Sequence, residues 1–166
     1  MRMLVIFAAK YLYLLVVAAA GVYWLLLARK NKLRFALQLL ATMVLAFALV
    51  KLLNALWYDP RPFVVDGVAP LIAHAADNGF PSEHTTYSMA IALVVLLWSW
   101  RWGSVLFILA AVVGRGRVAA HVHSVRQVIA GVVVAAVAVA VVYGVMKLFY
   151  KPKPEHSRTE EGLKIE

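Results

Sequence analysis

The sequence predicts an all-α membrane protein, built as one bundle of about five transmembrane helices with a short interfacial helix. Its 166 residues are 64% hydrophobic and only 15% charged, and the mean hydropathy is +0.82. A soluble domain of this size could not bury so much apolar surface. The apolar residues also fall into five runs, each near the ~20 residues that a helix needs to cross the hydrocarbon layer.

The five apolar runs cover about residues 4–28, 33–57, 83–100, 104–120 and 124–150. Pro60 and Pro62 end the second run, because proline cannot continue a helix. In the mixed loop that follows, residues 69–76 predict the short helix lying on the membrane surface. We interpret residues 1–150 as one transmembrane domain and the charged residues 151–166 as a disordered cytoplasmic tail.

Basic residues predict the orientation of the bundle. Five spans place the two chain termini on opposite sides, and one of these sides receives most of the basic link and tail residues. These are Arg29, Lys30, Lys32, Arg34, Arg101, Lys147, Lys151 and Lys153. The positive-inside rule makes this side cytoplasmic. The formal net charge of +9 then reflects topology and anionic lipid headgroups, and we expect no nucleic-acid partner.

Polar groups that suit phosphate recur at the predicted outer ends of the helices. Lys51 lies inside the second run, Arg61 follows the end of that run, and Arg117 closes the fourth. Ionisable groups near lipid are costly and need a reason, and arginine and lysine are the side chains that bind phosphate. These residues therefore predict a site for a phosphate ester at the membrane surface.

Two histidines in the same region have the chemistry for phosphoryl transfer. His123 opens the fifth run and could attack phosphorus to form a phosphohistidine. His84 could protonate the leaving oxygen, and Ser82 before it is a plausible N-cap beside helix amides that suit an anion. His74 and His121 could compete for these roles. The reaction needs no metal or cofactor, although a metal site made of these four histidines stays an alternative.

Three motifs in chain order resemble the type 2 phosphatidic acid phosphatase (PAP2) superfamily over about residues 45–131. They are Lys…Arg-Pro, Pro-Ser-x-His and Arg-x5-His. The third is similar in register to the family pattern Ser-Arg-x5-His-x3-Asp, with Gly116 replacing the serine. Glu83 inside the second motif, with Thr85 after it, resembles more closely the bacitracin-resistance type of undecaprenyl-pyrophosphate phosphatases.

The resemblance implies a PAP2-like fold and a role for each matching residue. The nucleophile corresponds to His123 and the general acid to His84. The phosphate-binding candidates, taken with the neighbours that complete the second motif, are Lys51, Arg61, Pro81, Ser82, Glu83 and Arg117. Family members work without metal and release inorganic phosphate from lipid phosphates.

One position departs from the family pattern. Gln127 stands where the family has the aspartate that orients the nucleophilic histidine. Glutamine can accept the Nδ1–H bond but supplies no full charge, and the corresponding change in a serine-protease triad lowers the rate by about 10⁴. Three accounts remain open: another carboxylate (Asp66, Asp77 or Glu83) substitutes, the enzyme tolerates lower activity, or the chain binds lipid phosphates without hydrolysing them.

The resulting hypothesis is hydrolysis of undecaprenyl pyrophosphate to undecaprenyl phosphate and phosphate, which recycles the cell-wall lipid carrier. The site would face the periplasm or cell exterior from the bacterial inner (plasma) membrane. Phosphatidic acid, phosphatidylglycerol phosphate and lipid A phosphates are alternative substrates, and a non-catalytic binder or transporter is an alternative function. An ion channel is disfavoured because the charges lie at the ends of the spans. Small residues of the fifth run, including Gly131 and Gly144, leave a homodimer open.

Overall fold

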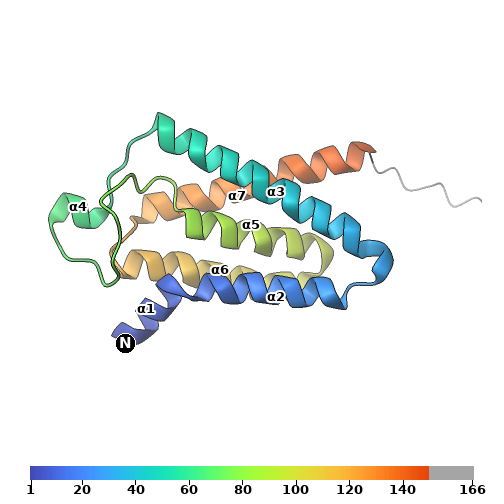
Figure 1. The fold of residues 1–166 in the computed structure, drawn as a ribbon, viewed down its shortest axis with the longest axis horizontal. Coiled ribbons are helices and arrows are strands. Elements are labelled where there is room, and N and C mark those ends of the chain that lie inside the picture. Colours follow the sequence, from blue (N-terminus) through green and yellow to red (C-terminus); the bar gives the residue numbers. More distant parts are fainter. Residues whose placement is uncertain (150–166) are drawn as a thin grey trace, which may run out of the picture.

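The computed structural model describes residues 1–149, so the predicted tail over 151–166 lies outside the described part. Long helices lie side by side, and the chain passes from one end of the bundle to the other between them (Figure 1). The helices are α1 (Arg2–Lys10), α2 (Leu12–Leu26), α3 (Arg29–Leu56), α4 (Pro62–Asp66), α5 (Glu83–Trp98), α6 (Trp100–Ala119) and α7 (Val125–Phe149). The predicted all-α membrane fold is confirmed.

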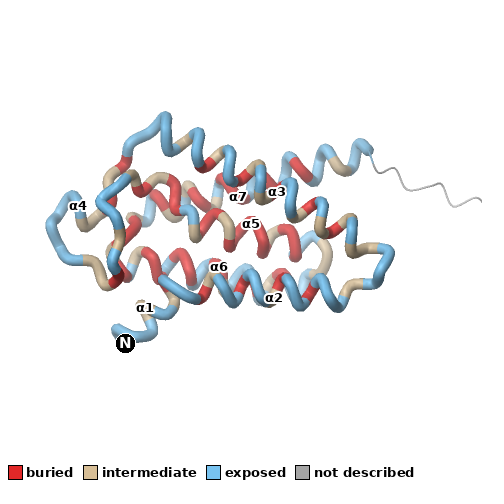
Figure 2. Tube along the Cα trace, viewed as in Figure 1, coloured by how far each residue is buried: buried red, intermediate tan, exposed pale blue. Residues whose placement is uncertain are grey.

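The long helices differ in how they meet the membrane. Of the described helices, α3, α6 and α7 are each long and apolar enough to span it, and α1 with α2 makes a fourth candidate. The third predicted span, α5, has 16 residues, about 24 Å of helix. It packs against α2, α3, α6 and α7, and its buried residues form the centre of the bundle (Figure 2). The surrounding helices therefore shield α5 from lipid.

The first predicted span is not one straight helix. α1 and α2 meet at Tyr11 with a bend of 50°. In a straight helix the Ala9 carbonyl would accept a hydrogen bond from the Tyr13 amide, but here it accepts one from Arg117 Nη1 at 3.1 Å. A side chain that enters the backbone ladder is a known cause of a helix bend. The bend holds α1 against the end of α6.

The predicted interfacial helix over residues 69–76 is wrong. The short helix is α4, because Pro62 suits the first helical position and Gly67, with φ of 71°, ends it in the left-handed region. Residues 69–76 are irregular. The Leu71 amide donates to the Ala120 carbonyl at 3.0 Å, and Ile72 is buried. The segment is thus fixed by the turn after α6.

Two glycines allow helices to approach closely near this end of the bundle. A Cβ on Gly116 would lie 2.9 Å from both Ala8 Cβ and the Ala9 amide nitrogen. This explains why a serine, expected there from the family pattern, does not fit while α1 stays in place. A Cβ on Gly131 would lie 2.9 Å from the Ser82 carbonyl oxygen. Gly131 therefore packs inside the bundle, and a homodimer remains a prediction.

Candidate active site

A polar cavity of about 260 Å³ opens at the end of the bundle that carries the long loop between α4 and α5. Side chains from α3, α5, α6 and the loops line it. They are Lys51, Asn54, Arg61, His74, Asp77, Asn78, Pro81, Glu83, His84, Arg117 and His123. The structure thus brings together most of the residues predicted as a site. Ser82 and Gln127 are buried and do not line the cavity.

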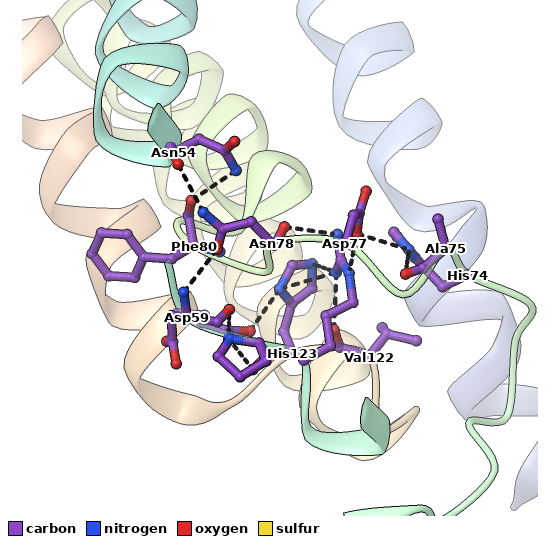
Figure 3. Close-up of polar contacts among 12 residues, drawn as sticks. Asn54, Asp59, His74, Ala75, Asp77, Asn78, Phe80, Val122 and His123 are labelled. Carbon is purple, nitrogen blue, oxygen red and sulfur yellow. Dashed lines mark hydrogen bonds and ion pairs between the residues drawn. The ribbon is translucent and has the colours of Figure 1, made fainter. Parts of the chain in front are cut away.

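His123 lies in the turn between α6 and α7, held between two polar neighbours (Figure 3). Its Nδ1 lies 3.1 Å from Gln127 Oε1, and its Nε2 lies 3.0 Å from Arg61 Nη1. Gln127 stands four residues later on α7, so one helical turn fixes their separation. Gln127 is thus the nearest partner of Nδ1, and Arg61 Nη1 lies closer to Nε2 than to Nδ1, from which it is 3.5 Å away.

The contacts of Gln127 assign the tautomer of His123. Gln127 Nε2 donates to the carbonyl oxygens of Asp59 and Pro60, both at 3.2 Å. Its Oε1 accepts from the Ser124 amide at 3.1 Å, so the amide cannot be turned round without opposing carbonyl oxygens. Oε1 therefore accepts the proton of His123 Nδ1, and Nε2 keeps its lone pair.

His123 is held neutral by its surroundings. Only 3% of the residue is exposed. Burial, together with the positive charges of Arg61 and Arg117, lowers the pKa of His123 from 6.5 to about 2. Desolvation and nearby like charge both disfavour the imidazolium. The unprotonated Nε2, which is the form that can act as a nucleophile, is thus the resting state at neutral pH.

Arg61 connects the loop, the turn and His123. Its Nη1 donates to the Val122 carbonyl at 3.0 Å, and its Nε donates to Asp77 Oδ1 at 2.7 Å. Burial tends to raise the pKa of the Asp77 carboxyl, but the hydrogen bond and charge of Arg61 outweigh it, and the pKa is lowered. Asp77, a candidate replacement for the missing aspartate, therefore pairs with Arg61.

Arg117 is a buried cation with spare donors. It is 3% exposed, and its Nη1 donates to the Ala9 carbonyl. Its Nε and Nη2 are buried and have no hydrogen-bond partner within residues 1–149. Leaving buried donors unpaired costs about 1–3 kcal/mol each, and more for charged groups. A phosphate oxygen at the cavity wall would satisfy these donors.

Lys51 and Glu83 form the solvent-exposed side of the cavity. Lys51 Nζ lies 2.8 Å from Glu83 Oε1, and the two side chains are 55% and 47% exposed. Such a pair contributes little to stability, but it links α3 to the first turn of α5. Glu83 and Asp66, the other proposed replacements for the aspartate, thus pair with Lys51 and with His121.

Ser82 occupies the predicted N-cap position of α5. Its side chain makes no capping hydrogen bond. Its amide donates to the Gln127 carbonyl at 3.0 Å, and its Oγ accepts from the Thr85 hydroxyl at 3.0 Å. Ser82 therefore joins α5 to α7 behind the cavity wall.

The other three histidines differ in whether they line the cavity. The His84 ring lies edge-to-face against the Tyr13 ring, 4.8 Å between centroids, and it lines the cavity. The His74 ring lies 6.2 Å from that of His123, and burial lowers the pKa of His74. His121 Nε2 pairs with Asp66 Oδ2 at 2.7 Å and is not part of the lining. The described residues contain no group of three His, Asp or Glu side chains placed to hold a metal ion.

Sequence reasoning missed the residue that organises the loop. Asn78 Nδ2 donates to the carbonyls of Asn54 and Trp57, both at 2.8 Å. Its Oδ1 accepts from the amides of Asp59 and Phe80 (Figure 3). The Asp-Asn-Gly stretch is a typical turn signal, but a turn signal does not name partners 19 to 24 residues away.

The family model of the PAP2 superfamily matches residues 35–151. The chain belongs to the PAP2 superfamily. A bacitracin transport permease protein BcrC from Bacillus licheniformis is 34% identical over 76% of this chain and 63% of its own length. The undecaprenyl-diphosphatase BcrC of Bacillus subtilis is 38% identical over 51% of this chain and 44% of its own. A putative undecaprenyl-diphosphatase YbjG of Escherichia coli is 35% identical over 72% and 61%. The chain thus spans less than two thirds of these relatives.

Solved structures confirm the fold of this PAP2 protein. The LpxE structure from Aquifex aeolicus superposes with a TM-score of 0.63 at 22% identity, covering 86% of this chain and 93% of that one. The PAP2-type phosphatidylglycerolphosphate phosphatase from Bacillus subtilis gives 0.55 at 21% identity, covering 90% and 76%. At these identities the likeness concerns the fold alone.

Proposed function

We propose that this PAP2 protein is a lipid phosphatase that removes the terminal phosphate of undecaprenyl pyrophosphate. The observation that carries the proposal is the neutral His123, with its Nε2 lone pair beside the two buried cations Arg61 and Arg117. A nucleophile next to a preformed cationic cavity suits attack on phosphorus. The names of the curated relatives favour the diphosphate substrate.

In the first step, His123 Nε2 attacks the terminal phosphorus and forms a P–N bond. The bond from phosphorus to the bridging oxygen breaks, and its electron pair stays on that oxygen. His84 transfers a proton to the leaving oxygen, and the negative charge of the bound substrate favours the protonated imidazole that this step requires. Arg61 Nη1, which lies 3.0 Å from Nε2, turns to a phosphate oxygen, and Arg117 donates its spare N–H groups to the same phosphoryl group.

In the second step, water attacks the phosphohistidine. His84 accepts a proton from the water, the P–N bond breaks, and inorganic phosphate leaves with His123 neutral again. The two histidines thus exchange roles between the steps, as microscopic reversibility requires. Lys51 faces the solvent-exposed side of the cavity and adds a point charge for the phosphate.

Gln127 positions the nucleophile in this proposal. Its Oε1 accepts the Nδ1 proton, which keeps Nε2 free for phosphorus. The three carboxylates that could replace the family aspartate all pair with other side chains. We therefore favour an enzyme that fixes the tautomer without a full negative charge and accepts a lower rate.

The proposed setting is a bacterial inner membrane, with the cavity at the outer face. The charge pattern supports this orientation, because Arg29, Lys30 and Lys32 lie at the opposite end of the bundle from the cavity (Figure 1). The product would remain in the outer leaflet as undecaprenyl phosphate, available for cell-wall synthesis.

The test is phosphate release by detergent-purified protein, measured with and without chelator. Undecaprenyl or farnesyl pyrophosphate should release phosphate in both conditions, and His123→Ala should lose at least about 10³-fold in rate. Phosphatidic acid, phosphatidylglycerol phosphate and lipid A in the same assay decide the substrate. Strict metal dependence, or turnover that survives in His123→Ala, contradicts the mechanism. Lipid binding without release would identify a non-catalytic binder.

A further inference from the structure

A second cavity, of about 570 Å³, adjoins the first. Three side chains line both cavities: His74, His84 and Arg117. The remaining wall of the second cavity comes from α1, α2 and the loop after α4, and includes Lys10 and Tyr13. None of the sequence motifs contains these last two residues.

The charge of the second cavity differs from that of the first. Its lining contains two cations, Lys10 and Arg117, and no carboxylate, whereas the lining of the first cavity includes Asp77 and Glu83. Lys10 is exposed and lies 5.3 Å from the centre of the Tyr11 ring. No salt bridge joins it to a carboxylate of residues 1–149. An anion in the second cavity would therefore meet uncompensated positive charge.

Arg117 lies at the boundary between the two cavities. Its Nη1 is held by the Ala9 carbonyl, and its unpaired Nε and Nη2 belong to a side chain that borders both spaces. A guanidinium group has a planar set of donors that can serve two phosphate groups at once. A ligand with two linked phosphates would satisfy the buried donors that the described protein leaves unpaired.

The positions of His123 and His84 indicate which cavity would hold the leaving group. His123 lines only the first, while His84 lines both. In phosphoryl transfer the attacking and leaving atoms lie roughly in line on opposite sides of phosphorus. With the nucleophile in the first cavity and the acid at the boundary, the leaving group lies on the side of the second cavity.

The wall of the second cavity also suits a phosphate that carries a hydrocarbon chain. Lys10 and the Tyr13 ring lie at the bend between α1 and α2, and the apolar side chains of Ile6, Leu14 and Leu71 complete the wall. The bend is what brings Lys10 to this place. A polar group and an apolar chain thus find matching surfaces within one cavity.

We infer that the second cavity binds the inner, lipid-linked phosphate of a diphosphate substrate through Lys10 and Arg117. The site therefore distinguishes lipid diphosphates from monophosphates. This inference rests on the proposed function. When the P–O bond to the bridging oxygen breaks, that oxygen remains on the inner phosphate and takes the proton of His84. Lys10 then stabilises the charge of the departing lipid monophosphate.

The turnover experiment compares farnesyl diphosphate with farnesyl monophosphate, which share one chain and differ by one phosphate. Lys10→Met should lower kcat/KM for the diphosphate by about tenfold or more, as expected for a lost charged hydrogen bond. The monophosphate should change by less than about twofold, and Lys10→Arg should retain most activity on both. Equal losses on the two substrates, or no loss on the diphosphate, would overturn the inference.

Lys147→Met is the matched control. Lys147 is also an exposed lysine over a tyrosine ring, 4.9 Å from the centre of Tyr143, but it lies near the end of α7 away from both cavities. Its substitution should leave both substrates unchanged. A loss on the diphosphate equal to that of Lys10→Met would mean that any surface lysine matters, and the subsite would be rejected.

A binding experiment separates the subsite from catalysis. Methylenediphosphonate, which cannot be hydrolysed, should raise the thermal unfolding midpoint more than inorganic phosphate does, and Lys10→Met should remove this difference. A protein that hydrolyses no lipid but keeps the Lys10-dependent preference would retain the subsite and lose the proposed function. Equal stabilisation by both anions in the unaltered protein would refute the subsite even if lipids are hydrolysed.

Discussion

Two pairs of basic side chains, one at each end of the bundle, are held in opposite ways. At the end away from the cavity, Lys32 lies 5.2 Å from the Trp24 ring centre and Arg101 lies 5.7 Å from that of Trp100. At the cavity end, Arg61 and Arg117 are 6% and 3% exposed and donate to carbonyl oxygens of the chain. The first arrangement is typical of side chains at a membrane surface. The second arrangement holds the two guanidinium groups in fixed positions before a ligand binds.

This difference shows what distinguishes a site from a charged surface. The far end holds its cations against aromatic rings, where water still solvates them. At the cavity end, backbone carbonyls hold the two buried arginines, and Arg117 keeps unpaired donors, so an anion gains strong interactions there. Lys10 and Lys51 at the same end lie over aromatic rings, as the far-end cations do. Burial and fixed geometry, more than the number of charges, should decide which substitutions affect function.

The largest contrast should come from two arginines. Arg117→Met should lower kcat/KM for lipid pyrophosphate by about 10²–10³-fold, the usual effect of removing one donor to a developing charge. Arg101→Met at the far end should change it by less than about twofold, as for an exposed residue away from the site. Phosphate release in detergent measures both. Equal effects of the two substitutions would erase the distinction between the ends.

Two buried glutamines provide the next comparison. Gln127 bonds to two carbonyls, an amide and His123. Gln38 accepts one bond from Trp98 at 2.8 Å, and its Nε2 has no partner within residues 1–149. Gln127→Met should lower the unfolding free energy by about 3 kcal/mol or more, and Gln38→Met by about 1 kcal/mol, since each buried group left unpaired costs about 1–3 kcal/mol. Thermal unfolding in one detergent ranks them, and the reverse ranking would contradict the described networks.

Acid should destabilise the cavity end through His123. Its folded pKa, about 2, lies below its ordinary value of 6.5, so below pH 6.5 the unfolded chain binds more protons than the folded one. The contribution of neutral His123 to the unfolding free energy is then fully present above pH 6.5. It falls as the pH drops, by up to about 2 kcal/mol between pH 7 and 5. In His123→Asn, the thermal unfolding midpoint should vary less with pH over this range than in the unaltered protein. An unchanged slope would show that His123 is not buried in its neutral form.

The smallest effect should come from the exposed pair on the cavity wall. Lys51→Met should lower the unfolding free energy by less than about 1 kcal/mol, because both partners of the Lys51–Glu83 bridge are half exposed. Lys32→Met is the control at the far end, and its effect should be equally small. A loss above about 2 kcal/mol for Lys51→Met alone would mean that the cavity end depends on its exposed charges as well.

The convergence of three motifs on one end was predictable, because apolar runs fix which segments share a membrane face. The partners within that end were not. The amide of Ser82 bonds to Gln127, and Asp77 pairs with Arg61, but spacing along the chain does not reveal such choices. Nor could composition predict the break at Tyr11. It depends on Arg117, more than a hundred residues away in sequence, reaching the Ala9 carbonyl.

The helix pair that meets at this break, α1 and α2, precedes the segment that matches the family model. The match to the family model begins at residue 35, and the matched segment contains both catalytic candidates and every cation proposed to bind the terminal phosphate. Lys10 and Tyr13 lie before it, on a helix pair that packs against α5 and α6. The Ala9 carbonyl and the close contact at Gly116 also tie this pair to α6. Under the proposal above, substitutions confined to the first two helices would therefore change which headgroup is accepted and leave His123 and Gln127 untouched.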